Sequence, residues 1–104
     1  MIWNDPFYLG KNCTKNYKKL KYRISNRMVH PGVYLLTFPR SGQGILEIIP
    51  SLILLQEHYP TDDLTIVGMG ATRREAISIV EQIVSETVRA RGDADVAAYM
   101  SEME

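Results

Sequence analysis

The clearest hydrophobic pattern lies between Leu64 and Gly92. A short apolar run over residues 64–68 is followed by a glycine-rich stretch and then by apolar residues that recur every three to four positions. The first feature predicts a buried strand, and the second predicts a long amphipathic helix that begins after Thr72. The apolar stripe of this helix consists of Ala76, Ile77, Val80, Ile83, Val84, Thr87 and Val88.

Both ends of this helix carry capping signals. Thr72 and Glu75 have the spacing of a capping box, in which the threonine oxygen accepts a hydrogen bond from the Glu75 N–H and the glutamate carboxylate accepts one from the Thr72 N–H. Gly92 can adopt the left-handed conformation that ends helices. Arg89 and Arg91 lie in the last turn, where cations complement the helix dipole.

A second helix is predicted over residues 14–28, with Thr14 as its N-cap. Its narrow apolar stripe consists of Tyr17, Leu20, Ile24 and Met28. The alternation of Leu20, Tyr22 and Ile24 would suit a strand, but it is the shorter match, so we favour the helix.

The two ends of the chain predict less regular structure. Residues 1–13 combine helix-breaking proline and glycine with large apolar side chains, namely Trp3, Phe7, Tyr8 and Leu9. We expect an irregular arm that packs these side chains on the core, because burial of aromatic rings is favourable. The alternative is an aromatic platform for a ligand. Residues 93–104 predict a short helix, capped by Asp93 or Asp95, with a frayed end.

The middle of the chain predicts a turn at His30-Pro31-Gly32, a strand over 33–38, a glycine-rich loop and a helix over 45–57. The strand is apolar almost throughout, which is typical of a strand covered on both faces. Pro50 lies inside the predicted helix and should kink or break it.

These elements predict a single small domain of the α/β class over residues 1–104. The strands over 33–38 and 64–68, joined by a helical crossover, would form a central βαβ unit and a small, mostly parallel sheet. Both strands would then be edges with unpaired backbone groups. We therefore expect either an additional strand from the N-terminal region or a homodimer that extends or covers the sheet.

Composition narrows the class of protein. The chain of 104 residues is 45% hydrophobic and 23% charged, which is ordinary for a globular domain. Its apolar runs are far shorter than the ~20 residues of a membrane span, and the residues after Met1 lack the features of a signal peptide. The lone Cys13 excludes an internal disulfide and fits a reducing compartment. We expect a cytoplasmic protein that does not bind membranes.

The formal net charge of zero conceals an asymmetry. Residues 1–44 hold eight Lys/Arg and one acidic residue, whereas residues 45–104 hold four Lys/Arg and eleven acidic residues. Such asymmetry can mark an anionic partner. The interpretation that we favour is that the two halves attract each other within the fold or across a homodimer.

The basic residues of the predicted helix 14–28 form one candidate site, for nucleic acid. They are Lys15, Lys18, Lys19, Lys21, Arg23 and Arg27. A one-sided basic helix is typical of binding to nucleic acids or membrane surfaces, and the narrow apolar stripe disfavours the membrane. The alternative is an ordinary solvated helix face.

The two glycine-rich loops, 40–44 and 68–74, form a second candidate site. If the strands are parallel, both loops emerge at the carboxyl end of the sheet, where α/β proteins bind ligands, beside a helix N-terminus that attracts anions. A phosphate, carboxylate or nucleotide would contact Arg40, Ser41, Gly42, Gly44, Gly68, Gly70, Thr72, Arg73 and Arg74. The dinucleotide and Walker fingerprints are incomplete. We favour the alternative, in which the glycines make a turn and Thr72 only caps the helix.

Catalytic candidates are sparse. His30 and His58 have no cysteine or carboxylate at the spacing of metal ligands. Cys13 with one of these histidines could form a thiol nucleophile pair, but the spacing does not support it. We expect no catalytic residue, no metal site and no cofactor.

Several runs spread over most of the chain carry a resemblance. They are His30-Pro31-Gly32-Val33-Tyr34, Leu54-Leu55-Gln56, Asp63-Leu64-Thr65-Ile66-Val67-Gly68, Glu75-Ala76 and Asp95-Val96-Ala97-Ala98-Tyr99. Together they resemble small uncharacterised α/β proteins of Gram-positive bacteria, a family without known activity. The resemblance implies one short cytoplasmic domain and no particular site.

The sequence therefore favours a non-enzymatic α/β association module that forms a homodimer. The alternatives are nucleic-acid binding through residues 14–28 and binding of a small anion or nucleotide at the glycine loops.

Overall fold

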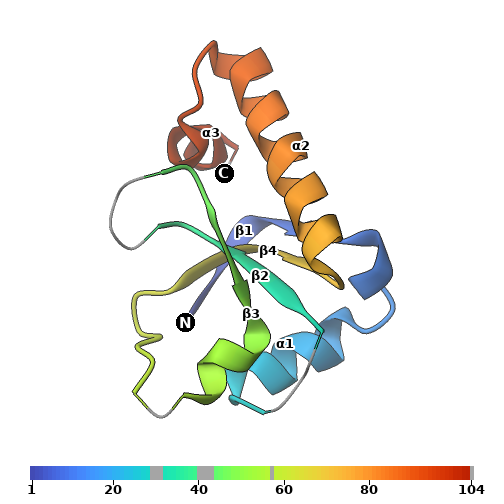
Figure 1. Cartoon of the computed structure of the whole chain (residues 1–104). Coiled ribbons are helices and arrows are strands. Elements are labelled where there is room, and N and C mark those ends of the chain that lie inside the picture. The colour runs from blue at the N-terminus through green and yellow to red at the C-terminus, as the bar shows by residue number, and fades with distance from the viewer. Residues whose placement is uncertain (29–31, 40–43, 57, 104) are drawn as a thin grey trace.

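Four strands form one sheet with helices packed on both of its faces (Figure 1). The computed structural model describes residues 1–28, 32–39, 44–56 and 58–103, so the predicted turn residues His30 and Pro31 lie outside it. The elements, with η for 3₁₀ helices, are β1 (Ile2–Leu9), η1 (Lys11–Cys13), α1 (Tyr17–Ser25), β2 (Tyr34–Thr37), β3 (Glu47–Pro50), η2 (Ser51–Leu55), β4 (Thr65–Gly70), α2 (Arg73–Arg91) and α3 (Val96–Glu102).

The sheet is mixed rather than mostly parallel. Its strand order is β1-β4-β2-β3. β1 pairs with β4 in parallel, whereas β2 pairs antiparallel with both β4 and β3. The α/β class is as predicted. The prediction of a parallel βαβ unit over 33–38 and 64–68 is wrong, because these segments contain the antiparallel neighbours β2 and β4.

The segment 45–57 is the source of this difference. The apolar spacing predicts a helix there, but the chain forms β3 and η2. β3 is the antiparallel neighbour of β2, with Ile48 opposite Leu36. β-Branched side chains suit this paired, half-buried position, and Pro50 then ends the strand. Without a helical crossover, nothing forces β2 and β4 to run in parallel.

The N-terminal arm is a strand and not an irregular segment. β1 pairs with β4 at both of its ends, with Trp3 opposite Ile66 and Tyr8 opposite Gly68. The residues between, Asn4–Phe7, face a single residue of β4 and form a bulge. Gly68 permits this pairing, because a Cβ at that position would lie 2.8 Å from the Tyr8 carbonyl oxygen. β1 thus supplies the additional strand expected from the N-terminal region.

The core has one part on each face of the sheet. β2 contributes Leu35 to one part and Leu36 to the other, and β4 contributes Ile66 and Val67 in the same way. Side chains of α1 and η2 complete the first part, and those of α2 and α3 complete the second. Figure 1 shows α1 on one side of the sheet and α2 and α3 on the other. This confirms the prediction that the strand over 33–38 is covered on both faces.

The first helix, α1, is shorter than the predicted helix 14–28. Its residue Leu20 is buried, as predicted. Thr14 is not the N-cap, because its hydroxyl donates to carbonyl groups of the preceding turn and Asn16 holds the cap position. Met28, the last residue of the predicted stripe, lies beyond the helix and is 49% exposed.

The two C-terminal helices begin and end at the predicted signals. Thr72 Oγ1 accepts a hydrogen bond from the Glu75 N–H at 3.0 Å, and Gly92 ends α2 with a φ of 79°. Asp95 caps α3, and its carboxylate accepts from the Ala98 N–H at 3.1 Å. None of the helices in the described part of the chain is both long and apolar enough to cross a bilayer.

Thr37, at the end of β2, is fully buried, and its hydroxyl has no hydrogen-bond partner among the described residues. An unpaired buried hydroxyl is costly, so Thr37→Val should raise the free energy of unfolding by about 1 kcal/mol. Urea denaturation measures the difference. Thr87→Val is the matched control, since Thr87 is equally buried but its hydroxyl donates to the Ile83 carbonyl oxygen at 2.8 Å. The control should show no gain, and a loss of stability in Thr37→Val would contradict the prediction.

Candidate functional site

The strands that lead into the two glycine-rich loops, β2 and β4, end at opposite ends of the sheet. Because β2 is antiparallel to β4, the loop that follows β2 emerges beside the beginning of β4. Gly44 in that loop lines a cavity of about 390 Å³ together with Ala94–Ala97. Gly70 ends β4 at the other end of the sheet, opposite Tyr34. The premise of one shared anion site is therefore wrong. Three residues of that site lie outside the described part of the chain: Arg40, Ser41 and Gly42.

The glycines of the second loop belong to β4 and not to a turn. Gly70 packs against the first turn of α2, where an added Cβ would lie 2.7 Å from the backbone nitrogen of Ala76. Gly68 likewise lets the backbone of β1 approach β4 closely. Both residues are buried, and both lack a side chain because a neighbouring backbone approaches too closely to admit one.

The N-terminus of α2 is occupied by a carboxylate of the chain itself. Glu75 Oε1 accepts from the Ala71 N–H at 2.9 Å, and Oε2 accepts from the Asn12 side-chain amide at 2.7 Å. The capping box is thus modified, since Glu75 reaches Ala71 and not the N–H of Thr72. Arg73 and Arg74 in the same turn are exposed. An external anion would compete with the Glu75 carboxylate for these donors, and its binding stays a prediction.

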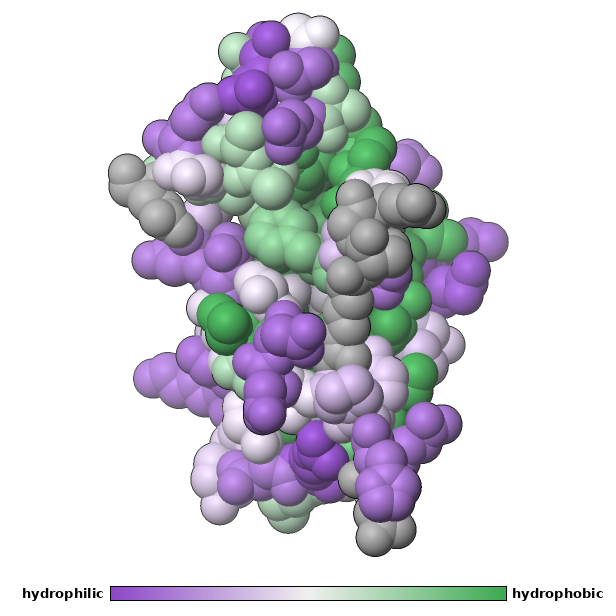
Figure 2. Space-filling model, turned by 90° about the vertical axis from the view of Figure 1, so that its left-hand side faces the viewer, coloured by the Kyte–Doolittle hydropathy of each residue, from purple (hydrophilic) through white to green (hydrophobic). Residues whose placement is uncertain are grey.

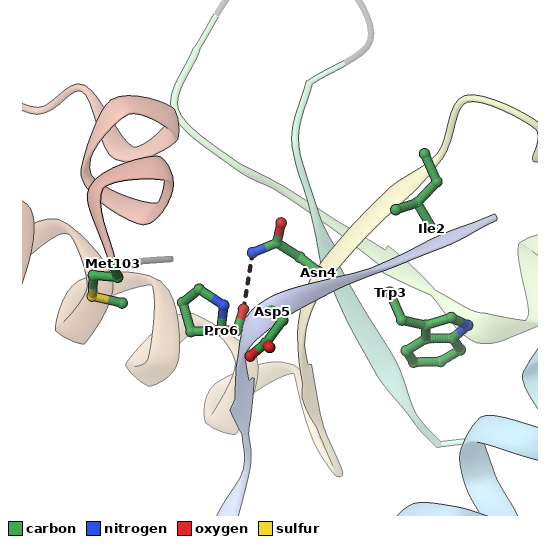
Figure 3. Close-up of a pocket in the computed structure, with 6 residues that line it drawn as sticks. All are labelled: Ile2, Trp3, Asn4, Asp5, Pro6 and Met103. Carbon is green, nitrogen blue, oxygen red and sulfur yellow. Dashed lines mark hydrogen bonds between the residues drawn. The ribbon is translucent and has the colours of Figure 1, made fainter.

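The larger cavity lies along the edge strand β1 and beside the end of α3 (Figure 3). Its volume is about 590 Å³, and its lining consists of Ile2, Trp3, Asn4, Asp5, Pro6 and Met103. The Asn4 amide donates to the Pro6 carbonyl oxygen at 2.9 Å, so it is engaged within the bulge. Asp5 is the one ionisable side chain among the six. The lining therefore lacks the paired groups on which acid–base or nucleophilic catalysis depends.

A hydrogen-bonded carboxylate joins β1, α2 and α3. Glu86 Oε1 accepts from the hydroxyls of Tyr8 at 2.8 Å and Tyr99 at 3.3 Å, and Oε2 accepts from the Gln82 amide at 2.9 Å. Partial burial alone would raise the pKa of Glu86, but these hydrogen bonds lower it below its usual value. Burial, and then the hydrogen bond to Glu86, raise the pKa of Tyr8. Both groups keep their ordinary states at neutral pH, so the cluster fastens the helices to β1.

Cys13 and His58 lie in unlike environments. Cys13 is 1% exposed, and burial raises the pKa of its thiol. A buried thiol with a raised pKa is a poor nucleophile. His58 is exposed. Within the described ranges, no group of three His, Cys, Asp or Glu side chains is arranged to hold a metal ion.

Contacts between described residues engage two of the six basic residues predicted to bind nucleic acid. Lys21 Nζ lies 5.5 Å from the centroid of the Trp3 ring, which is a cation–π contact. Arg27 Nη2 donates to the Tyr59 carbonyl oxygen and to Thr61 Oγ1, both at 3.0 Å. These two cations are therefore engaged with groups of the chain itself.

Lys15, Lys18 and Lys19 are exposed, and Arg23 is half-buried. The ion pairs between described residues join Arg91 to acidic side chains of the C-terminal half. They do not involve the lysines of α1. The interpretation favoured from the sequence is attraction between the basic and acidic halves within the fold or across a homodimer. The ion pairs within the described part of the chain leave these three lysines available.

An apolar surface extends along β3 and the adjacent flank of α2. The sheet covers only part of the predicted α2 stripe, because Ile77 is 39% exposed and Val88 is 47% exposed. Val80 and Val84 are half-buried against the core on the same flank. We define the β3–α2 surface as Ile45, Leu46, Ile48, Ile77, Val80, Val84 and Val88. Figure 2 shows apolar side chains gathered on the upper right of the molecule, with hydrophilic side chains between and below them.

Sequence reasoning did not identify this surface as a site. The signal was present, since the apolar stripe of α2 is wider than one sheet contact requires. The β3 part of this surface could not be predicted, because the apolar spacing over 45–57 indicates a helix.

Comparison with protein-family models, with curated proteins and with solved structures finds no match to this chain. The resemblance to small α/β proteins of Gram-positive bacteria therefore stays a prediction.

The Glu86 cluster makes stability depend on pH. Tyr8→Phe should lower the free energy of unfolding at neutral pH by about 1 kcal/mol, because it removes one hydrogen bond to a carboxylate. The pKa of Glu86 is lowered by folding, so its contribution is present above the unfolded pKa, about 4.3, and is lost as pH falls further. The difference between the two proteins should therefore shrink in acid.

Urea denaturation across the acid range measures this difference. Tyr22→Phe is the matched control, because Tyr22 is 65% exposed and loss of its hydroxyl should leave stability unchanged at every pH. An equal effect of the two substitutions would show that the bond from Tyr8 to Glu86 contributes nothing.

Proposed function

We propose that this chain is a non-enzymatic association module that pairs with a second copy of itself through the β3–α2 surface. The observation that carries the proposal is that β3, which has no further strand beside it in the described part of the chain, lies next to an exposed apolar helix flank. Exposed apolar patches mark protein–protein contacts, and an unpaired strand edge can accept another strand.

The two edges of the sheet differ in their capacity to pair. β1 is bulged at Asn4–Phe7 and contains Pro6, and both features interrupt the addition of a further strand. β3 pairs regularly with β2 along its whole length. Its free side is interrupted only at Pro50, which lacks an N–H. β3 is therefore the edge that favours association.

The alternation of hydrogen bonds identifies the outward groups of β3. The Ser51 N–H donates to the Val33 carbonyl oxygen at 2.9 Å. Such residues alternate along an antiparallel strand, so every second residue before Ser51 also directs its N–H and C=O toward β2. Leu46, Ile48 and Pro50 then direct their backbone groups away from β2, where a second strand can reach them.

A two-fold axis at Ile48 would pair most of these groups. The Ile48 residues of the two copies would exchange N–H···O=C bonds with each other. Each Leu46 N–H would donate to the Pro50 carbonyl oxygen of the second copy, whereas the Leu46 carbonyl oxygen would receive no N–H from the proline and would accept from water at the end of the ladder. Such self-complementary pairing is the usual basis of two-fold dimers.

The same axis would place the two α2 helices side by side on one face of a continuous sheet. Ile77, Val84 and Val88 project from the flank that lies toward β3. Their burial would add stabilisation at about 25 cal/mol per Å² of apolar surface. The exposed Glu81 borders this flank and would form part of a polar rim.

Lysine at the apolar flank should prevent association. Val88→Lys should weaken dimerisation by roughly tenfold or more, because a charged side chain would face the apolar surface of the second copy. Sedimentation or light scattering over a concentration series measures the effect. Ile2→Lys is the matched control, since Ile2 is 52% exposed on the opposite edge strand. A monomeric wild-type chain, or a dimer sensitive only to Ile2→Lys, would overturn the proposal.

The register can be tested by cross-linking. Ile48→Cys should form a disulfide-linked dimer on mild oxidation, because opposed residues at the axis have Cα atoms about 5.5 Å apart, within disulfide range. Leu46→Cys is the control, since its two copies would lie about 14 Å apart along the strands. The native Cys13 is buried and does not compete. Equal cross-linking of both variants would contradict this register.

A further inference from the structure

Tyr22 is an exposed aromatic residue on the outward face of α1. Its side chain is 65% exposed, the highest value among the exposed large hydrophobic residues of the described chain. Leu20 and Ile24, two positions before and after it, are buried. Tyr22 therefore projects from the opposite side of the helix. The core does not use this ring.

Lysines lie around this ring. Lys18 and Lys19 precede Tyr22 by one helical turn and share its face, and Lys15 lies in the turn before α1. All three are exposed. The sequence has no acidic residue between Asp5 and Glu47, so the helix carries no carboxylate that could neutralise them.

We propose that this face, composed of Lys15, Lys18, Lys19 and Tyr22, binds single-stranded nucleic acid. The lysine ammonium groups would contact phosphates, and the tyrosine ring would stack on an unpaired base. The inference goes beyond the proposed association and does not depend on it. α1 packs on one face of the sheet and α2 on the other, so the two surfaces are separate.

The exposed ring distinguishes a single strand from other anionic partners. Bases in a duplex stack on one another, whereas unpaired bases are free to stack on aromatic side chains. A helix that binds a membrane surface presents a broad apolar face to it, but the buried residues Leu20 and Ile24 of α1 face the core.

Fluorescence anisotropy of labelled oligothymidylate and oligouridylate, each of about twelve nucleotides, tests the inference with the wild-type chain. Binding to three lysines predicts a slope of about −2 in a plot of log K against log salt concentration. Tyr22→Ala should weaken binding by about tenfold, because one base loses its stacking partner. Tyr22→Phe keeps the ring and should bind as the wild type does.

A charge-matched pair of variants locates the site. Lys18→Gln with Lys19→Gln removes two charges from the face and should reduce both the affinity and the salt slope. Arg73→Gln with Arg74→Gln removes two charges at the N-terminus of α2 and should leave binding unchanged. A duplex of the same length and phosphatidylserine vesicles should bind more weakly than the single strands.

Four results would overturn the inference. They are no binding at low salt, equal binding by Tyr22→Ala, loss of binding in the Arg73 and Arg74 variant alone, and tighter binding to the duplex or to vesicles. Circular dichroism of each variant distinguishes lost binding from lost folding.

Discussion

The central position of β4 is the constraint on which the rest of the structure depends. This strand has neighbours on both edges and core side chains on both faces, so it is buried from Ile66 to Gly70. Two glycines make this possible, Gly68 toward β1 and Gly70 toward α2. A Cβ at these positions would lie 2.8 Å and 2.7 Å from backbone atoms, and a close-packed interior cannot absorb such contacts without displacement.

With β4 at the centre, the two faces and the two edges of the sheet acquire different characters. α2 and α3 cover one face, and α1 with η2 covers the other. The bulge of β1 closes one edge, whereas β3 leaves the other edge regular. The apolar β3–α2 surface and the basic face of α1 are therefore separated by the sheet, and occupation of one does not obstruct the other.

Periodic patterns predict which side chains share a face of a helix, but they do not predict which of these side chains the fold engages in contacts of its own. The lysines of α1 follow from the sequence, whereas the engagement of Lys21 by Trp3 and of Arg27 by Tyr59 depends on contacts between distant segments. The glycine loops show the same limit. Glycine indicates a special backbone position, but only the fold distinguishes a ligand cradle from a close approach of strand and helix.

The sequence by itself determined the elements that are stabilised locally. α2 begins at Thr72 and ends at Gly92 because its cap bonds join residues only a few positions apart, and β2 is apolar because both of its faces are covered. Only the tertiary structure decided that 45–57 forms β3 and η2, because a short apolar run fits a strand and a helix almost equally well. Strand direction was decided in the same way, since it depends on hydrogen bonds between β4 and segments that are remote in the sequence.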